Sequence, residues 1–310
     1  MNLGSLRSII GIEHPIIQGP FGGGLSTVEL ASVVSNGGGL GSYGAHHLSP
    51  EHIRGIVDEM RAQTAKPFAV NLWVSDHDAG GRTLTQSQFE KALEHYRPFY
   101  DELGMSAPEM PSYFGQQFEV QVEALIAAAP PVFSFVYGVP SPAILDSCRS
   151  AGIVTIGTAT TVAEAVALHN AGVDIIVATG LEAGGHRVSF LDEPEDSLFG
   201  TLALVPQVVD AVSVPVVAAG GIADGRGIVA AFALGAVGAQ IGTAFLATRE
   251  SGTVDFHREQ ILASPSRPTV LTRAFTGRLA RGIPNSLSQA LRPAVDQLHR
   301  SQFALGLRRP

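Results

Sequence analysis

Residues 173–187 read Val-Asp-Ile-Ile-Val-Ala-Thr-Gly-Leu-Glu-Ala-Gly-Gly-His-Arg, and this stretch decides the fold class. Its first six residues form a strongly apolar run of the kind that makes a buried strand, and a glycine-rich loop carrying His186 follows directly. Two similar junctions come later, at Gly220-Gly221 and Gly242-Thr243. Repeated strand-then-glycine junctions indicate an α/β barrel whose loops hold a phosphorylated cofactor.

Apolar runs alternate with helical stretches over nearly the whole chain, which is the pattern of a parallel sheet with helical crossovers. We expect strands at residues 15–18, 39–42, 68–72, 132–135, 154–156, 174–178, 215–218 and 239–241. Eight strands with about as many crossovers favour a closed (β/α)8 TIM barrel over an open doubly wound sheet. The first crossover helix is expected at 26–36, with Ser26 as its N-cap and Glu29 as the capping-box partner.

The alternation stops between residues 75 and 117, which are polar, aromatic and rich in glycine and proline apart from a helix expected at 86–100. A segment of this length is more often a lid or subdomain than an unstructured loop. We therefore predict a barrel from residues 1–74 and 118–250, an inserted lid or substrate subdomain at 75–117 after the third strand, and a C-terminal helical tail at 251–310 packed on the barrel.

Aromatic residues of this insert could wall an apolar substrate pocket with Trp73 at its base, although ordinary lid packing explains them equally well. The residues concerned are Tyr96, Phe99, Tyr100, Tyr113 and Phe114.

Composition excludes several classes of protein. A formal net charge of −8 argues against nucleic acid or an anionic membrane as partner. Cys148 is the only cysteine, so no intrachain disulfide can form, and we expect it to be a small buried apolar residue. Residues 1–12 lack the apolar core of a signal peptide, which makes a cytoplasmic protein the expectation. The uncharged run 227–248 is long enough for a membrane span, but glycines divide it into a helix, a turn and a strand.

The glycine motifs differ in how well they are placed. Residues 39–44, Gly-Leu-Gly-Ser-Tyr-Gly, match the dinucleotide fingerprint by spelling, yet they form the strand itself, which argues against a Rossmann site. Gly220-Gly221 and Gly242-Thr243 follow the seventh and eighth strands, where barrel loops and the N-terminus of a short helix commonly bind phosphate. Tight turns alone are the other explanation for these pairs.

Two further positions suit a planar ligand. Residues 19–24, Gly-Pro-Phe-Gly-Gly-Gly, follow the first strand and could lie flat against a ring, or could act as a hinge. Asn71 ends the third strand and offers both a donor and an acceptor to the edge of a heterocycle, unless it is only a capping residue.

His186 is the candidate acid or base, because an imidazole with a pKa of about 6.5 suits a general base near neutral pH. Glu182 could orient His186, or could form an ion pair with Arg187. Three other histidines, His46, His47 and His52, have no carboxylate at ligand spacing, so we expect solvated side chains and no metal site.

These segments together resemble the nitronate monooxygenase family, formerly called 2-nitropropane dioxygenases, and its class I branch in particular. The resemblance covers most of the chain and follows the order of the family's motifs. It is carried by residues 15–20 (PIIQGP), 26–31 (STVELA), 38–42 (GGLGS), 70–72 (VNL), 134–138 (SFVYG), 182–187 (EAGGHR), 218–226 (AAGGIADGR), 240–246 (QIGTAFL), 276–278 (TGR) and 280–282 (ARG).

The resemblance implies an FMN-dependent enzyme that oxidises alkyl nitronates, such as propionate 3-nitronate, with O2. The products would be a carbonyl compound and nitrite, formed through a flavosemiquinone. His186 matches the family's catalytic base, which takes the α-proton of a neutral nitroalkane or contacts the anionic nitronate. The positions expected at the flavin are Gly19, Pro20, Phe21, Asn71, Thr179, Gly184, Gly185, Gly220, Gly221, Gln240, Ile241, Gly242 and Thr243.

The sequence departs from the family pattern at three of its positions. Phe21 stands where methionine is usual, Thr179 where a glutamine often contacts flavin, and Val136 where the fourth-strand motif carries histidine. Two other functions therefore stay open: an NAD(P)H-dependent flavin reductase acting on quinones or enoyl-acyl-carrier proteins, and a non-catalytic flavin- or phosphate-binding barrel. Partners are expected to be a small-molecule substrate and O2, with the protein a monomer or homodimer.

Overall fold

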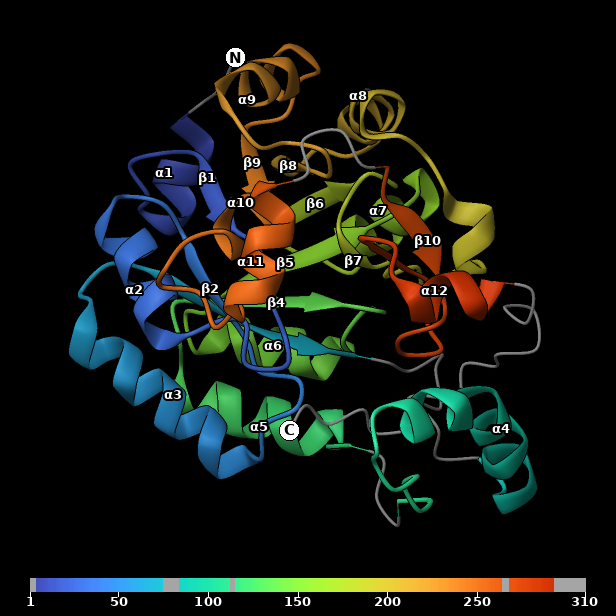
Figure 1. Ribbon diagram of the computed structural model, residues 1–310. Coiled ribbons are helices and arrows are strands. Elements are labelled where there is room, and N and C mark those ends of the chain that lie inside the picture. Colours follow the sequence, from blue (N-terminus) through green and yellow to red (C-terminus); the bar gives the residue numbers. More distant parts are fainter. Residues whose placement is uncertain (1–3, 75–83, 112–114, 264–267, 293–310) are drawn as a thin grey trace. The chain divides into compact units, whose positions relative to one another are not determined.

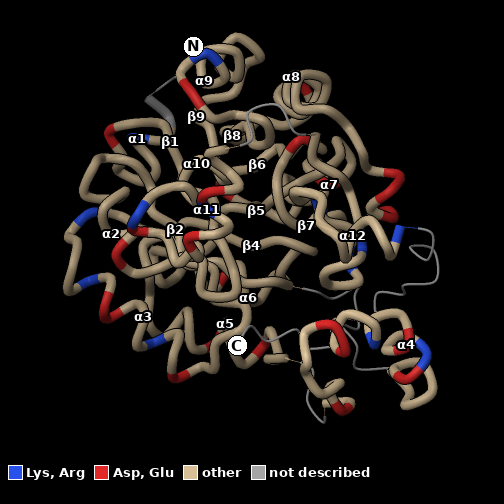
Figure 2. Tube along the Cα trace, in the orientation of Figure 1, with Lys and Arg blue, Asp and Glu red and all other residues tan. Residues whose placement is uncertain are grey.

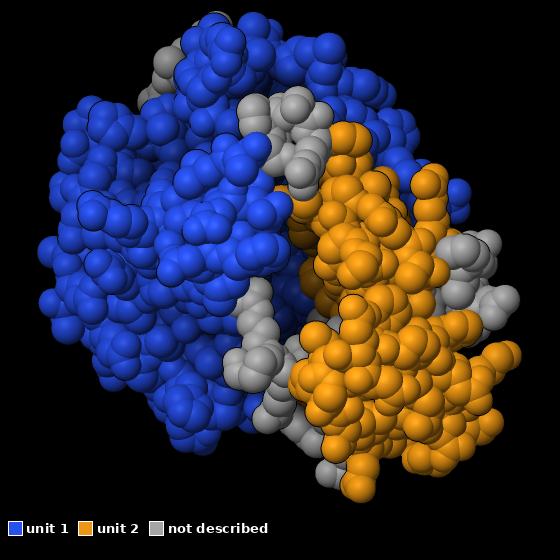
Figure 3. Space-filling model, in the orientation of Figure 1, with its two compact units in different colours: residues 1–74, 116–184, 188–265 blue, residues 75–115, 185–187, 266–310 orange. Residues whose placement is uncertain are grey.

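The computed structural model describes residues 4–74, 84–111, 115–263 and 268–292. The chain forms two compact units, which are coloured separately in Figure 3. Unit 1 takes residues 1–74, 116–184 and 188–265, and unit 2 takes residues 75–115, 185–187 and 266–310. This division differs from the segments expected from the sequence: residues 251–265 cluster with unit 1, and the three residues around His186 cluster with unit 2.

Unit 1 is built on a parallel sheet of eight strands in the order β1-β9-β8-β6-β5-β4-β3-β2. A parallel bridge between Ile17 and Leu40 joins the two edge strands and closes the sheet. The predicted (β/α)8 TIM barrel is confirmed, and Figure 1 shows its strands surrounded by helices. The strands are β1 (Ile16–Gln18), β2 (Gly41–Gly44), β3 (Phe68–Trp73), β4 (Val132–Val136), β5 (Val154–Ala159), β6 (Ile175–Thr179), β8 (Val216–Ala219) and β9 (Gly238–Ile241).

Helices follow the strands in the expected alternation, and residues with hydroxyl side chains are the N-caps of several of them. Ser49, Ser141 and Thr161 each cap the helix that they precede. The described helices of unit 1 are α1 (Gly4–Ile10), α2 (Val28–Asn36), α3 (Pro50–Gln63), α5 (Phe118–Ala128), α6 (Pro142–Ser150), α7 (Val162–Asn170), the 3-10 turn η1 (Pro194–Ser197), α8 (Thr201–Ala211), α9 (Gly225–Ala233), α10 (Thr243–Leu246) and α11 (Asp255–Leu262).

The predicted cap of the first crossover helix was wrong by one residue. Thr27, not Ser26, is the N-cap of α2, and its hydroxyl accepts the N–H of Leu30 at 2.9 Å. The buried hydroxyl of Ser26 instead accepts the Phe21 N–H at 2.9 Å and donates to the Ser42 carbonyl at 3.2 Å. Ser26 thereby fixes the glycine-rich loop that follows β1.

Two apolar layers stabilise the barrel. The interior is filled by Leu6, Ile10, Ile12, Ile17, Leu40, Ala69, Val132, Ile156, Ile175, Val177, Val217 and Ala219. A larger cluster, which includes Val70, Leu72, Phe133, Phe135 and Leu204, lies between the strands and the helices. The eight barrel strands carry no charged residue, whereas outer helices such as α3 carry both signs, as Figure 2 shows. Burial of apolar surface in these two layers is the main stabilising contribution.

Unit 2 contains a small antiparallel sheet and a separate apolar cluster. The sheet has the order β10-β11-β7, formed by β10 (Val270–Thr272), β11 (Ala280–Gly282) and β7 (Gly185–His186). The cluster joins α4 (Gln86–Glu102) to residues near β10, and the Tyr96 hydroxyl donates to the Ala274 carbonyl at 2.9 Å. The helix predicted at 86–100 is confirmed, whereas Tyr113 and Phe114 lie outside the described residues.

The end of the chain is only partly described. Within the segment expected to be a C-terminal helical tail, the structure has α12 (Ser286–Ala290). None of the helices in those ranges combines the length and apolar character that a bilayer crossing requires. The uncharged run 227–248 instead forms most of α9, then β9 and α10, as expected.

Candidate active site

A polar layer lies inside the barrel at the carboxyl ends of its strands. Side chains alternate along a strand, so Asn71, Ser134 and Thr179 follow the interior residues Ala69, Val132 and Val177 toward the same side of the sheet. Asn71 is buried and donates from Nδ2 to Ser134 Oγ at 3.0 Å. Polar groups at this end of a TIM barrel mark the face that hosts active sites.

The sequence suggested that Asn71 ends the third strand, but it lies two residues before the end of β3. No described residue donates a hydrogen bond to its Oδ1 atom, although the side chain is 3% exposed. Gln240 is in register with Ala219 on the neighbouring strand, and its side chain likewise has no hydrogen bond within the described residues. Both amides can therefore bind a polar ligand edge.

The loop after β1 packs backbone to backbone against the end of β9. The Gly19 N–H donates to the Ile241 carbonyl at 2.8 Å, and a Cβ on Gly19 would lie 3.3 Å from Gly242 Cα. The Phe21 ring covers this junction, with Cε1 3.6 Å from that Cβ position and 3.7 Å from the equivalent position on Gly242. A side chain on Gly19 would be tightly packed where these two loops meet, and the Phe21 side chain lies beside them.

The loops after β6 and β8 are also crowded at their glycines. Gly220 and Gly221 adopt φ values of +103° and +71°, which favour glycine. A Cβ on Gly220 would lie 2.8 Å from Thr201 Oγ1. A Cβ on Gly184, where flavin contact is expected, would lie 3.0 Å from Thr243 Oγ1. These contacts bring the loops after β6, β8 and β9 together.

Backbone donors collect at these loops. Within the described ranges, no residue accepts a hydrogen bond from the N–H of Gly221, Gly242 or Thr243. Gly221 and Thr243 are exposed, and β8 and β9 are neighbouring strands. Several backbone N–H groups at adjacent glycine loops are what a phosphate group requires.

Glu182 is engaged by hydrogen bonds within unit 1. Its carboxylate accepts the Thr201 N–H at 2.9 and 3.1 Å, and the Thr201 hydroxyl lies 2.9 Å from Oε2. The same hydroxyl lies 2.9 Å from the Gly220 carbonyl. Thr201 is the first residue of α8, and it was not singled out in the sequence.

His186 lies in a two-residue strand rather than in a loop. Within unit 2, β7 pairs with β11, and His186 stands opposite Ala280. The Arg187 N–H donates to the Leu279 carbonyl at 2.8 Å and extends this pairing. His186 Nε2 lies 2.9 Å from Thr276 Oγ1. The backbone and the ring of the candidate base are therefore both held by residues 276–280.

The histidines after β2 differ in their surroundings. His46 is half-buried and stacks on Trp73, with ring centroids 3.8 Å apart and an interplanar angle of 6°, so the expectation that it is solvated was wrong. The Tyr137 ring contacts the Trp73 ring edge-on, with centroids 5.0 Å apart, and Tyr137 has a left-handed backbone with φ of +65°. His47 and His52 are exposed as expected. Among described residues no group of three or more His, Cys, Asp and Glu could hold a metal ion.

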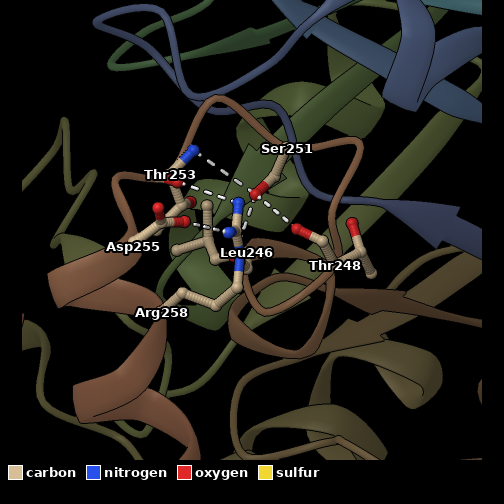
Figure 4. A network of polar contacts seen from close by, with 6 residues as sticks. All are labelled: Leu246, Thr248, Ser251, Thr253, Asp255 and Arg258. Atoms are coloured by element: carbon tan, nitrogen blue, oxygen red, sulfur yellow. Dashed lines mark hydrogen bonds and ion pairs between the residues drawn. The ribbon is translucent and has the colours of Figure 1, made fainter.

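The segment after α10 is held by the polar network drawn in Figure 4. Arg258 donates to Asp255 at 2.6 Å and to the Thr253 carbonyl at 2.9 Å. The Ser251 hydroxyl lies within 3.0 Å of the carbonyl oxygens of Leu246 and Thr248. Because the N–H of the intervening residue 252 donates to the Leu25 carbonyl, this network also ties the segment to the loop after β1.

The chain and its fold are similar to several known proteins. The family model for nitronate monooxygenase matches residues 4–302. A protein of Staphylococcus haemolyticus (strain JCSC1435) named "Probable nitronate monooxygenase" is 42% identical over 289 residues, which cover 93% of this chain and 80% of that protein.

Two solved structures extend the comparison to the fold. Nitroalkane oxidase from Streptomyces ansochromogenes matches with a TM-score of 0.87 and 34% identity, over 97% of this chain and 85% of its own. FabK from Thermotoga maritima matches with a TM-score of 0.68 and 29% identity, over 97% of this chain and 86% of its own.

The family match spans both the glycine loops of unit 1 and the His186 segment of unit 2. A match of this extent identifies the family, for which flavin use and a small-molecule substrate are expected. The resemblance found in the sequence motifs is confirmed. The chain belongs to the nitronate monooxygenase family and is an enzyme.

Proposed function

We propose that this enzyme uses FMN to oxidise alkyl nitronates, such as propionate 3-nitronate, with O2, giving a carbonyl compound and nitrite. The observation that carries the proposal is the set of backbone donors at Gly221, Gly242 and Thr243 that meet no acceptor among the described residues, next to the crowded Gly220. We expect the enzyme to work in the cytoplasm as a monomer or homodimer.

The residues present fit FMN. The backbone donors at Gly221, Gly242 and Thr243 suit a terminal phosphate, and Gly184 and Gly220 allow the loops that carry them to pack closely. The Asn71 amide suits a polar edge of the ring system, and Phe21 offers an aromatic face in place of methionine. Other expected lining positions are Gly19, Pro20, Thr179, Gly185, Gln240 and Ile241. When bound, FMN supplies the electron transfer between the nitronate and O2.

His186 is the proposed base and charge stabiliser. A neutral nitroalkane must lose its α-proton before oxidation, and a preformed nitronate arrives as an anion. The imidazole can accept that proton, and in its protonated form it stabilises the negative charge of the nitronate. Both roles suit a group with a pKa near neutrality.

The hydrogen bond between His186 Nε2 and Thr276 Oγ1 can run in either direction, and its direction decides which ring nitrogen is the base. The Thr276 hydroxyl has one hydrogen, and the Arg278 carbonyl at 3.5 Å can only accept. If that hydrogen goes to the carbonyl, the hydroxyl oxygen accepts from His186 Nε2–H at 2.9 Å. Nδ1 is then the basic nitrogen, and the imidazolium formed after proton transfer keeps its bond to Thr276.

The test compares two forms of one substrate with a His186→Ala variant. Activity on neutral nitroethane should fall by about 10²- to 10⁴-fold, the usual contribution of a general base, whereas activity on preformed ethyl nitronate should fall much less. His52→Ala, which changes an exposed histidine of α3, is the matched control. Equal losses on both substrate forms would reject His186 as the carbon base.

The competing function is an NAD(P)H-dependent flavin reductase. Mixing the FMN-loaded enzyme anaerobically with a nitronate should change the flavin absorbance, and mixing it with NADH or NADPH should not. Rapid bleaching by a nicotinamide together with no response to the nitronate would favour the reductase. No response to either, with His186→Ala also without effect, would favour a non-catalytic flavin-binding barrel.

A further inference from the structure

The peptide between Gly220 and Gly221 is flanked on both sides by a residue without a side chain. Both residues have positive φ, +103° and +71°, and neither carries a side chain that would resist rotation of the intervening peptide plane. One orientation presents the Gly221 N–H to a ligand, and the flipped orientation presents the Gly220 carbonyl in its place. An anionic ligand is attracted by the first and repelled by the second.

Thr201 selects between these orientations. Its hydroxyl lies 2.9 Å from the Gly220 carbonyl. In a trans peptide the C=O and the following N–H point in opposite directions, and the chain has no cis bond in its described parts. A hydrogen bond to the Gly220 carbonyl therefore directs the Gly221 N–H away from Thr201, and this N–H has no acceptor in the described residues.

Glu182 holds Thr201 in place through hydrogen bonds. The carboxylate accepts the Thr201 N–H with both oxygens, at 2.9 and 3.1 Å. Thr201 is the first residue of α8, an 11-residue helix, and a negative charge is stabilised at the N-terminus of such a helix. The single hydroxyl hydrogen of Thr201 has three acceptors within reach, Glu182 Oε2 at 2.9 Å, the Gly220 carbonyl at 2.9 Å and the Ala219 carbonyl at 3.3 Å, and we assign it to the Gly220 carbonyl.

We infer that Thr201, held by Glu182, is a positioning residue for the phosphate of FMN: it locks the Gly220–Gly221 peptide with the Gly221 N–H toward the ligand. This inference rests on the proposed FMN site. It concerns one contact of the cofactor, since Thr201 acts through Gly221 and needs no contact with FMN.

The experiment compares FMN with riboflavin, which has the same ring system and no phosphate. Apoprotein is titrated with each flavin, and dissociation constants are measured from flavin fluorescence. Thr201→Val removes the hydroxyl and keeps the shape, and Thr201→Ser restores the hydroxyl. Thr64→Val is the matched control, because this buried hydroxyl also makes side-chain hydrogen bonds, at the amino end of β3.

Loss of one neutral hydrogen bond should weaken FMN binding by about tenfold in Thr201→Val, with riboflavin binding unchanged. Thr201→Ser and Thr64→Val should keep the wild-type preference for FMN. If Thr201→Val does not fold, Thr201→Ala removes the same hydroxyl without a branched side chain and answers the same question.

Different results would contradict the proposed phosphate site and the role of Thr201. A wild-type protein that binds FMN no more tightly than riboflavin would overturn the proposed phosphate site. A wild-type preference that survives in Thr201→Val, or is lost through equal weakening of both flavins, would overturn the role of Thr201 alone.

Discussion

His186 Nε2 lies 2.9 Å from Thr276 Oγ1, although 90 positions separate the two residues in the chain. The contact lies within unit 2, where β7 and β11 are paired and bring residues 185–187 beside residues 276–282. The proposed base therefore belongs to a different compact unit from the glycine loops, and the chain passes from one unit to the other between Gly184 and Gly185.

Replacing Thr276 by valine should lower kcat on a neutral nitroalkane by about tenfold, because the ring of His186 loses the partner that fixes its orientation and its imidazolium. Thr276→Ser should restore most of that activity. The measurement is the pH profile of kcat/KM for both variants. A profile and rate unchanged in Thr276→Val would mean that Thr276 does not position His186.

Gly220→Ala and Gly23→Ala should differ although both glycines have positive φ. A Cβ on Gly23 would meet nothing within 4 Å, so its cost is confined to backbone strain, about 1–2 kcal/mol. A Cβ on Gly220 would lie 2.8 Å from Thr201 Oγ1 and 3.0 Å from the Gly180 carbonyl. Urea unfolding and FMN titration should show a larger loss of stability in Gly220→Ala, and weakened FMN binding only there. Similar behaviour of the two variants would contradict the crowding of this loop.

The thiol of Cys148 should be unreactive in the folded protein. Cys148 is fully buried, and burial, followed by the charge of Asp174, raises its pKa from 9.0 to about 11. At pH 8 only about one thiol in a thousand is then ionised. A disulfide reagent should titrate one thiol in urea and none in buffer. Rapid reaction of the folded protein would contradict this burial.

The same shift has a consequence for stability. The folded pKa lies above the unfolded one, so the folded state holds its proton more tightly, and unfolding releases a proton once the pH exceeds 9.0. The contribution of Cys148 is therefore fully present below pH 9 and is lost as the pH rises toward 11. In Cys148→Ala, the free energy of unfolding should fall less steeply over this pH range than in the wild type.

Trp73 should affect substrate preference. It is the only tryptophan, it lies at the carboxyl end of β3, and it stacks on His46 with ring centroids 3.8 Å apart. Trp73→Ala removes this aromatic surface and should change the ranking of nitronates by alkyl chain length. Phe133→Leu, a change in the buried core of β4, serves as control. An unchanged ranking in Trp73→Ala would remove Trp73 from the substrate site.

The barrel could be predicted because its signals are local. Each strand is a short apolar run, and predicted and observed bounds differ by only a few residues, as in β6, expected at 174–178 and observed at Ile175–Thr179. Ser26 and Thr27 show the limit: both can cap a helix, and tertiary contacts of Ser26 with Phe21 and Ser42 decide between them.

The residue types proposed for the site have local sequence signals, whereas the contacts between them do not. Glycine at 220, 221 and 242 has a local signature, since it follows apolar runs at the expected strands. The pairing of Glu182 with Thr201 and of His186 with Thr276 has none, because both pairs form only when distant segments pack. Residues 276–278 did appear among the family-like motifs, which was the one signal for Thr276.

The most direct test of the central claim is oxygen uptake by the FMN-loaded enzyme with propionate 3-nitronate, run beside NADH and with nitrite measured at the end. We expect oxygen uptake and nitrite formation with the nitronate and neither with NADH. Oxygen uptake with NADH and none with the nitronate would contradict it.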